Sequence, residues 1–175
     1  MLRSLIKYVF LLLLSVPGSA QFVTAKLQVI GLTCSACSFG TERSIRQLKF
    51  VEDVKMDLNS NLAEITFKKG EAVSIDKLVQ KVYDAGFSVG KVVVIYQFSN
   101  EQLNGTWWTL GSDSYSFLDK TPAELKGALE LTFVGEKFMP KKDYKKWKPL
   151  IDATKSLPGG SLNGHLYFIL LSQPS

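Results

Sequence analysis

The amino-acid sequence predicts an α+β protein made of an N-terminal βαββαβ sandwich and a C-terminal β-rich part. Between residues 22 and 95, four segments show alternating apolar and polar residues, as strands do. Two further segments have apolar residues at helical spacing. Beyond residue 95, short alternating segments are separated by turn clusters, which favours strands. The 175 residues are 46% hydrophobic and 21% charged, which is typical of a globular chain with one ordinary domain or two small ones.

Six elements are expected in the N-terminal part. The first strand carries Leu27 and Val29 on the side opposite Lys26, as a half-buried strand does. Ser74 is a typical N-cap for the second helix, and Gly86 is a typical residue to end it. The order of these elements is the split βαβ, or ferredoxin-like, unit. The elements are expected at residues 23–30 (strand), 36–48 (helix), 53–58 (strand), 63–68 (strand), 74–86 (helix) and 87–94 (strand).

The C-terminal part reads as about five strands with one late helix, which favours a small barrel resembling the OB architecture. A glycine and two serines at 111–114 predict a hairpin turn, and the helix is expected at 140–148. Strand alternation predicts that one ring of the Trp107-Trp108 pair is buried and the other exposed. The chain therefore divides into a leader at 1–20, a ferredoxin-like domain at 22–95 and a small β-rich domain of unknown role at 96–175.

The leader has the pattern of a secretory signal peptide. Arg3 and Lys7 precede an apolar run at residues 8–14, which is too short to span a membrane, and small residues at 18–20 form a cleavage site. The mature chain would begin near Gln21, without a transmembrane segment, in a secreted or periplasmic compartment. Such compartments are oxidising, so its two cysteines would form a disulfide or be held reduced by a metal or a redox partner.

Cys34 and Cys37 are the only cysteines and the one soft, reactive centre of the chain. They are expected to straddle the start of the first helix, where free N–H groups and the helix dipole stabilise thiolate. Two thiolates suit Cu(I), whereas a structural Zn(II) site needs four ligands. A two-coordinate ion in an exposed loop also leaves room for a third sulfur, which favours transfer by ligand exchange.

The segment GLTCSAC at 31–37, between a strand and a helix, and DAGFSV at 84–89 resemble the heavy-metal-associated domain family. This is the fold of copper chaperones, of the N-terminal domains of copper-transporting ATPases and of a periplasmic mercury-binding protein. The resemblance covers roughly residues 22–95. With the leader and the tail containing FMPKKDYKKWK, the chain is similar to exported bacterial proteins whose C-terminal domain has no known role.

The resemblance implies a metal site made by Cys34 and Cys37 and supported by Leu32, Thr33 and Phe87. Leu32 stands where the family's GMxCxxC loop has Met, and it keeps an apolar anchor beneath the loop. Phe87 matches the family position that packs near the metal. Cu(I) is the expected ion, with Ag(I), Hg(II) and Zn(II) as other thiophilic ions. A metal-exchanging protein is the expected partner, and two chains could share one ion through four thiolates.

Two other interpretations of the cysteine pair stay open: a thiol-disulfide redox protein, and a structural disulfide in an interaction module that binds no metal. The sequence has no Ser/His/Asp set, paired-carboxylate signature or phosphate loop, so no enzymatic activity beyond thiol-disulfide exchange is expected. Nucleic acid is not expected as a partner, because the net charge of +5 is modest and the predicted compartment is periplasmic or extracellular. His165, the single histidine, is expected to be structural.

Residues 137–148 contain six lysines and one aspartate. This cluster indicates either docking to an acidic partner or an anionic lipid surface, or a solvated helix face with Phe138, Tyr144 and Trp147 packed inward. The second interpretation is the one favoured by the sequence alone.

Overall fold

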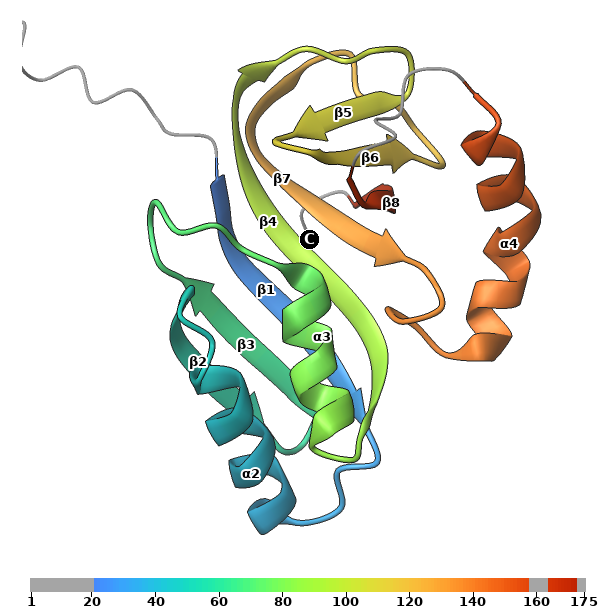
Figure 1. Cartoon of the computed structure of the whole chain (residues 1–175). Coiled ribbons are helices and arrows are strands. Elements are labelled where there is room, and N and C mark those ends of the chain that lie inside the picture. The colour runs from blue at the N-terminus through green and yellow to red at the C-terminus, as the bar shows by residue number, and fades with distance from the viewer. Residues whose placement is uncertain (1–20, 158–163, 173–175) are drawn as a thin grey trace, which may run out of the picture.

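The computed structural model describes residues 21–157 and 164–172, so the predicted signal peptide at 1–20 lies outside the described residues. The strands form one open mixed sheet in the order β2-β3-β1-β4-β7-β8-β6-β5 (Figure 1). The elements are β1 (Gln21–Ile30), α2 (Ser35–Arg46), β2 (Val51–Asp57), β3 (Leu62–Phe67), α3 (Ile75–Asp84), β4 (Ser88–Glu101), β5 (Trp107–Leu110), β6 (Asp113–Phe117), β7 (Leu125–Val134), α4 (Lys141–Lys155) and β8 (Leu166–Ser172).

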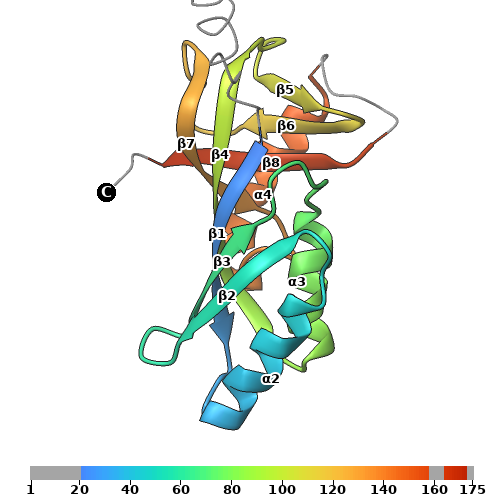
Figure 2. The ribbon, with the colours of Figure 1, turned by 90° about the vertical axis from the view of Figure 1, so that its left-hand side faces the viewer.

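The first six elements follow the predicted βαββαβ order. Strand β1 pairs antiparallel with β3 and with β4, and β2 pairs with β3 at the sheet edge. Helices α2 and α3 cover one face of these strands (Figure 2). The apolar side of β1 meets α3 in the main core, where Leu27, Leu78 and Val82 have no solvent exposure. Burial of this apolar stripe is what selects the register of the strands.

Strand β4 extends the sheet into the C-terminal part of the chain. Its 14 residues pair with β1 over Ser88–Gln97 and with β7 over Val93–Glu101, so both edges of its middle section are hydrogen-bonded. Strands β8, β6 and β5 then continue the same sheet, with β6 and β8 parallel. The described strands therefore form an open extension of the N-terminal sheet in place of the barrel that the strand count favoured. Periodicity identifies strands, but it does not say which distant strands pair.

Helix α4 covers the sheet over a second, smaller core. Trp107, Ile151 and Phe168 are buried in this cluster, and Tyr144 and Trp147 pack against it. Neighbouring residues on the same strands, including Trp108 and Tyr167, point into the main core. The expectation of one exposed ring at Trp107-Trp108 is therefore wrong: the two are 2% and 1% exposed because both faces of β5 are covered.

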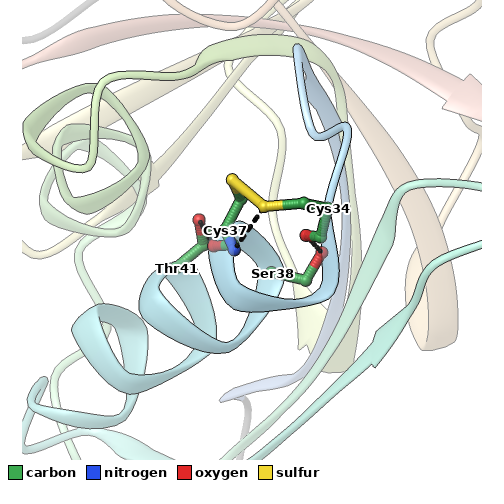
Figure 3. Close-up of a disulfide and its surroundings, with 4 residues drawn as sticks. All are labelled: Cys34, Cys37, Ser38 and Thr41. Carbon is green, nitrogen blue, oxygen red and sulfur yellow. Dashed lines mark hydrogen bonds between the residues drawn. A yellow bond between two sulfur atoms is a disulfide. The ribbon is translucent and has the colours of Figure 1, made fainter.

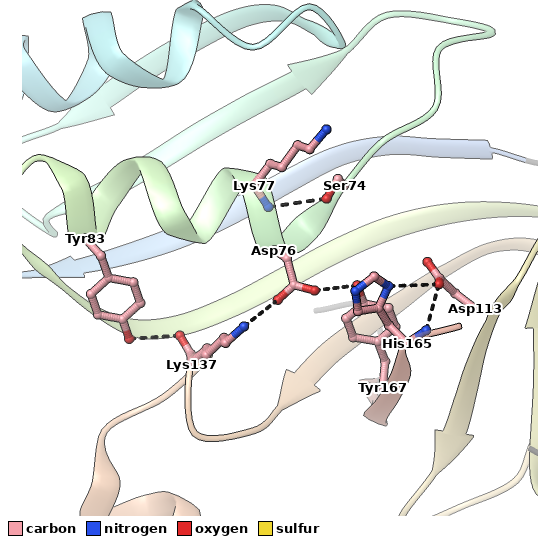
Figure 4. A network of polar contacts seen from close by, with 8 residues as sticks. All are labelled: Ser74, Asp76, Lys77, Tyr83, Asp113, Lys137, His165 and Tyr167. Carbon is pink, nitrogen blue, oxygen red and sulfur yellow. Dashed lines mark hydrogen bonds and ion pairs between the residues drawn. The ribbon is translucent and has the colours of Figure 1, made fainter. Parts of the chain in front are cut away.

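A polar network joins α3 to the C-terminal strands (Figure 4). The Tyr167 hydroxyl donates to Asp76 Oδ2 at 2.7 Å, and Lys137 Nζ lies 3.6 Å from Asp76 Oδ1. The Tyr83 hydroxyl donates to the Lys137 carbonyl at 3.0 Å. These contacts hold the start of α3 against β8 and both ends of α3 against the loop between β7 and α4.

His165 has a structural place, as expected. Its Nδ1 lies 3.2 Å from Asp113 Oδ1, and its backbone N–H donates to the same oxygen (Figure 4). The pair fixes the start of β8 beside the start of β6.

Candidate metal centre

The loop that carries the cysteines begins where β1 ends. Gly31 adopts φ +98°, which L side chains rarely occupy, and the chain turns there toward α2. Leu32 then points into the main core and is 7% exposed, whereas Thr33 is exposed. A buried anchor directly before two exposed positions holds the loop down while leaving its tip in solvent.

Cys34 is the N-cap of α2, and Cys37 lies in the first turn (Figure 3). The Cα atoms are 5.4 Å apart, and the two sulfurs are joined in a disulfide. The Cys37 backbone N–H donates to Cys34 Sγ at 3.2 Å. Cys34 thus occupies the position where serine or aspartate usually caps a helix, and its sulfur accepts the bond that their oxygen would accept.

The electrostatic surroundings of the pair favour negative sulfur. The first turn of α2 has no acidic residue, and its free N–H groups carry the positive end of the helix dipole. Two hydroxyls nearby are occupied by the backbone: Thr41 Oγ1 donates to the Cys37 carbonyl at 3.0 Å, and Ser38 Oγ to the Cys34 carbonyl at 3.4 Å (Figure 3). These hydroxyls stiffen the turn and are not aimed at the sulfurs.

An open and largely apolar surface lies on the Cys37 side of the pair. Cys37 and Phe87 line one shallow hollow of about 510 Å³ together with residues of α2 and the end of α3. Phe87 is half-buried and lies so near the loop that a Cβ on Gly31 would be 3.6 Å from its ring. Phe39, one turn into α2, is 67% exposed. The apolar hollow thus lies on the Cys37 side of the pair, whereas exposed Cys34 faces a smaller hollow with polar neighbours such as Thr33 and Asn61, and a partner thiol can reach it from solvent.

The described residues offer the site two sulfur atoms and little else. No group of three or more His, Cys, Asp or Glu side chains within ranges 21–157 and 164–172 is placed to hold an ion. His165 pairs with Asp113 at the start of β8, far along the chain from the cysteines. After reduction, the donor set would be two thiolates, which fits a soft ion of low coordination number and does not complete a four-ligand zinc site.

The structure brings together all five positions named from the sequence, namely Leu32, Thr33, Cys34, Cys37 and Phe87. Two features of the site were not anticipated. Thr41 donates its hydroxyl to the Cys37 carbonyl, and Phe39, two residues after Cys37, is exposed. The sequence did contain a signal for this bond: Thr41 lies four residues after Cys37, and a helical threonine can donate to the carbonyl four residues before it. No signal in the sequence predicts whether Phe39 is exposed or buried.

A cysteine pair at the first strand–helix junction of a ferredoxin-like unit, with Cys34 exposed, is the class of site that fold and geometry define. Residues 26–88 match the family model of the heavy-metal-associated domain. The match ends at the first residue of β4 and covers well under half of the chain.

Two curated relatives match the same part of the chain. A probable copper-transporting ATPase, HMA5, of Arabidopsis thaliana is 34% identical over 68 residues, 39% of this chain and 7% of that protein. A copper-transporting ATPase of Helicobacter felis is 35% identical over 63 residues, 36% of this chain and 8% of that protein. The chain thus spans less than a tenth of the length of these relatives, and the similarity is to one segment of each.

Among solved structures, the copper transporter domain Ccc2a of yeast is 30% identical, with a TM-score of 0.35, over 38% of this chain and 90% of that one. Oxidised MerP from Ralstonia metallidurans is 33% identical, with a TM-score of 0.34, over 41% of this chain and 97% of that one.

Within the described residues, no helix is both long and apolar enough to cross a membrane.

Proposed function

We propose that this chain captures Cu(I) through the reduced thiolates of Cys34 and Cys37 and passes it to a protein partner by thiolate exchange. The observation that carries the proposal is the position of the two cysteines: they lie at the exposed N-terminus of α2, and their Cα atoms are 5.4 Å apart. The family match over residues 26–88 and the similarity to copper-transporting ATPases support copper as the ion.

Metal binding requires the disulfide to open first. A dithiol reductant transfers two electrons to the sulfur–sulfur bond, becomes a disulfide itself, and leaves Cys34 and Cys37 as thiols. Binding of Cu(I) then displaces the thiol protons, because the thiolate is the form that binds metal. The helix N-terminus lowers the cost of this charge, since it supplies the N–H of Cys37 to the Cys34 sulfur.

Transfer follows from low coordination and exposure. Two protein sulfurs leave the solvent side of the ion open to a third thiolate from a partner. Cys34 is exposed and Cys37 is half-buried, so we expect the partner to exchange first with Cys34. The outer position of Cys34 makes hand-over a sequence of single substitutions, with no step at which free ion is released.

The test is an anaerobic Cu(I) titration of the reduced chain against a competing chelator. One equivalent is expected to bind, and the Cys34→Ser, Cys37→Ser double variant is expected to bind none in competition. Ser35→Ala is a matched control, because this exposed residue lies between the cysteines and provides no sulfur. Ag(I), Hg(II) and Zn(II) belong in the same titration, and gel filtration of the loaded chain reports whether two chains share an ion.

Equal Cu(I) affinity of the double variant would overturn the proposal, as would failure of the reduced native chain to compete with the chelator. The oxidised chain is an internal control, because its sulfurs are joined and should not bind. Loss of binding in Ser35→Ala would assign the effect to the loop in general, which also contradicts a dithiolate site.

A second function is favoured by the disulfide itself: thiol-disulfide exchange through Cys34. An incoming thiolate would attack the exposed Cys34 sulfur, form a mixed disulfide and release Cys37 as a thiolate beside the helix N-terminus. The distinguishing measurement is the reduction potential of the pair together with the rate of disulfide reduction in a model substrate. A strongly reducing, catalytically slow pair would exclude this function.

We propose further that the chain is exported with cleavage after Ala20. The support is the basic start, the apolar run and the small residues of the leader. N-terminal sequencing of chain secreted by its own host is expected to begin at Gln21, and recovery of intact Met1 from the cytoplasmic fraction alone would contradict export.

A further inference from the structure

The outer side of the first half of α4 is a lysine surface, which we define as Lys141, Lys142, Lys145 and Lys146. All four side chains are exposed, and their spacing of one and four residues places them on one side of the helix. The opposite side packs on the sheet through Tyr144, Trp147 and Ile151. The aromatic residues of the helix pack inward, as the sequence favoured. The four lysines take no part in this packing and remain in solvent.

This surface has little internal neutralisation. Lys146 lies 3.5 Å from Asp143, whereas Lys141, Lys142 and Lys145 have no acidic partner within 4.0 Å in the described part of the chain. Toward the end of α4, by contrast, Asp152 pairs with both Lys148 and Lys155. The unbalanced charge of the helix is therefore concentrated in its first two turns.

Helix stability does not explain that placement. The positive end of the helix dipole lies at the N-terminus of α4, where acidic residues stabilise and lysines destabilise. Pro140 is the N-cap and makes no side-chain hydrogen bond, and Asp143 is the one acidic residue of the first turn. Adjacent lysines at 141 and 142 weaken a helix start that is already poorly capped, so their charge is better explained by something outside the chain.

From this surface we infer that α4 docks on anionic phospholipid membranes. Protein–protein interfaces are depleted in lysine and enriched in arginine, and every basic residue of α4 is lysine. A lipid surface needs no directional partner for each charge, which suits four flexible point charges gathered in the first two turns of the helix, over roughly 9 Å. Leu150, in the second half of the helix, and Leu157, two residues after its end, are 42% and 51% exposed and so are available for apolar contact at the lipid boundary.

Docking through α4 would leave the cysteines accessible. In Figure 1, α4 lies at the right of the molecule and the start of α2 at the bottom, at the far end of the N-terminal sheet. The lysine surface and the dithiol can therefore be engaged at the same time. The inference does not depend on the proposed metal binding, because it uses no residue of the metal site.

The experiment is sedimentation of the full chain with phosphatidylcholine vesicles, with and without phosphatidylglycerol. Each lysine near an anionic surface contributes about 1 kcal/mol, roughly fivefold in binding, so Lys141, Lys142, Lys145 and Lys146 changed together to Gln should weaken binding tenfold or more. The readout is the increment that the anionic lipid adds over neutral vesicles, because residues 1–20 contain an apolar run of their own. About 0.5 M salt should abolish the increment.

The matched control changes Lys49, Lys55, Lys68 and Lys69 to Gln. These lysines are equally exposed, lie on or beside β2 and β3, and alter the net charge by the same amount. The control is expected to keep most of the increment. Equal loss in both quadruple variants, or no increment for the native chain, would overturn the inference. Binding of polyglutamate through the same lysines without vesicle binding would also overturn it, by assigning the surface to an acidic protein.

Discussion

Gly31 and Gly40 lie on either side of the cysteine pair and differ in what they contribute at the level of a single residue. Gly31 adopts φ +98° at the end of β1, so alanine there would be strained whatever space surrounds it. Gly40 lies inside α2, with nothing within 4 Å of where its Cβ would be. The first glycine is needed for the turn into the loop, and the second weakens the helix that carries the cysteines.

We therefore expect opposite effects from one substitution. Gly31→Ala should lower the free energy of unfolding by about 1 kcal/mol or more, and Gly40→Ala should raise it by about 0.5–1 kcal/mol. Urea unfolding of the oxidised chain measures both. A stabilising Gly31→Ala would mean that the loop does not require the left-handed conformation, and the structure of the site would have to be revised.

Buried tyrosines predict an alkaline limit to stability. Burial, with a smaller effect from Glu101, raises the pKa of Tyr96 to about 12, and burial also raises the pKa of Tyr115. Unfolded tyrosine ionises near pH 10. Stability from these groups is thus complete below pH 10 and is lost as pH rises from there toward the folded pKa, at up to about 1.4 kcal/mol per pH unit for each group.

Tyr96→Phe isolates this effect, because the buried Tyr96 hydroxyl has no hydrogen-bond partner in the described part of the chain. At pH 7 the variant should unfold within about 0.5 kcal/mol of the native chain. Between pH 10 and 12 its stability should fall less steeply, by about 1.4 kcal/mol per pH unit. Urea unfolding of both chains measures this. If the stability of the native chain and that of the variant fell in parallel across this pH range, Tyr96 would ionise in the folded state as it does in the unfolded one.

At the scale of elements, the contact between α3 and β8 is the one that sequence periodicity cannot supply. Asp76 and Tyr167 are 91 residues apart, and their bond of 2.7 Å joins the helix start to a strand of the C-terminal part. Tyr167→Phe should cost about 1.5–3 kcal/mol at pH 7, because it removes a partly buried hydrogen bond to a carboxylate. Tyr96→Phe is the comparison, because it removes a hydroxyl that has no partner among the described residues. Equal losses of unfolding free energy in the two variants would contradict a specific role for the bond.

Elements with local signals were predictable, and pairings between distant segments were not. The helix between Ser74 and Gly86 carried its own N-cap and terminator, and the structure places α3 between them. Trp107 and Trp108 alternated as predicted for a strand, but the sequence did not show that α4 covers the second face and buries both rings. The positions of the cysteines could be predicted from the order of the strand and helix around them. Their oxidation state could not, because a disulfide, a bound metal and a redox partner all stayed open.

For the whole molecule, sharing of β4 between the two parts suggests that they unfold together. The middle of this strand bonds to β1 on one edge and to β7 on the other, so loss of either part exposes a row of unpaired backbone groups on the other. The N-terminal part and the C-terminal part then behave as one cooperative unit, although the sequence suggests a boundary at residue 95.

The location of the tryptophans makes this prediction testable. The chain's three tryptophans (Trp107, Trp108 and Trp147) all follow β4, so their fluorescence reports on the C-terminal part. Leu78→Ala removes a fully buried side chain from α3 and should cost about 2–5 kcal/mol. If the sheet unfolds as one unit, this change in the N-terminal part lowers the urea midpoint of tryptophan fluorescence as much as that of far-ultraviolet circular dichroism. A fluorescence midpoint that stays in place while the dichroism curve splits into two steps would show two independent domains joined by a continuous strand.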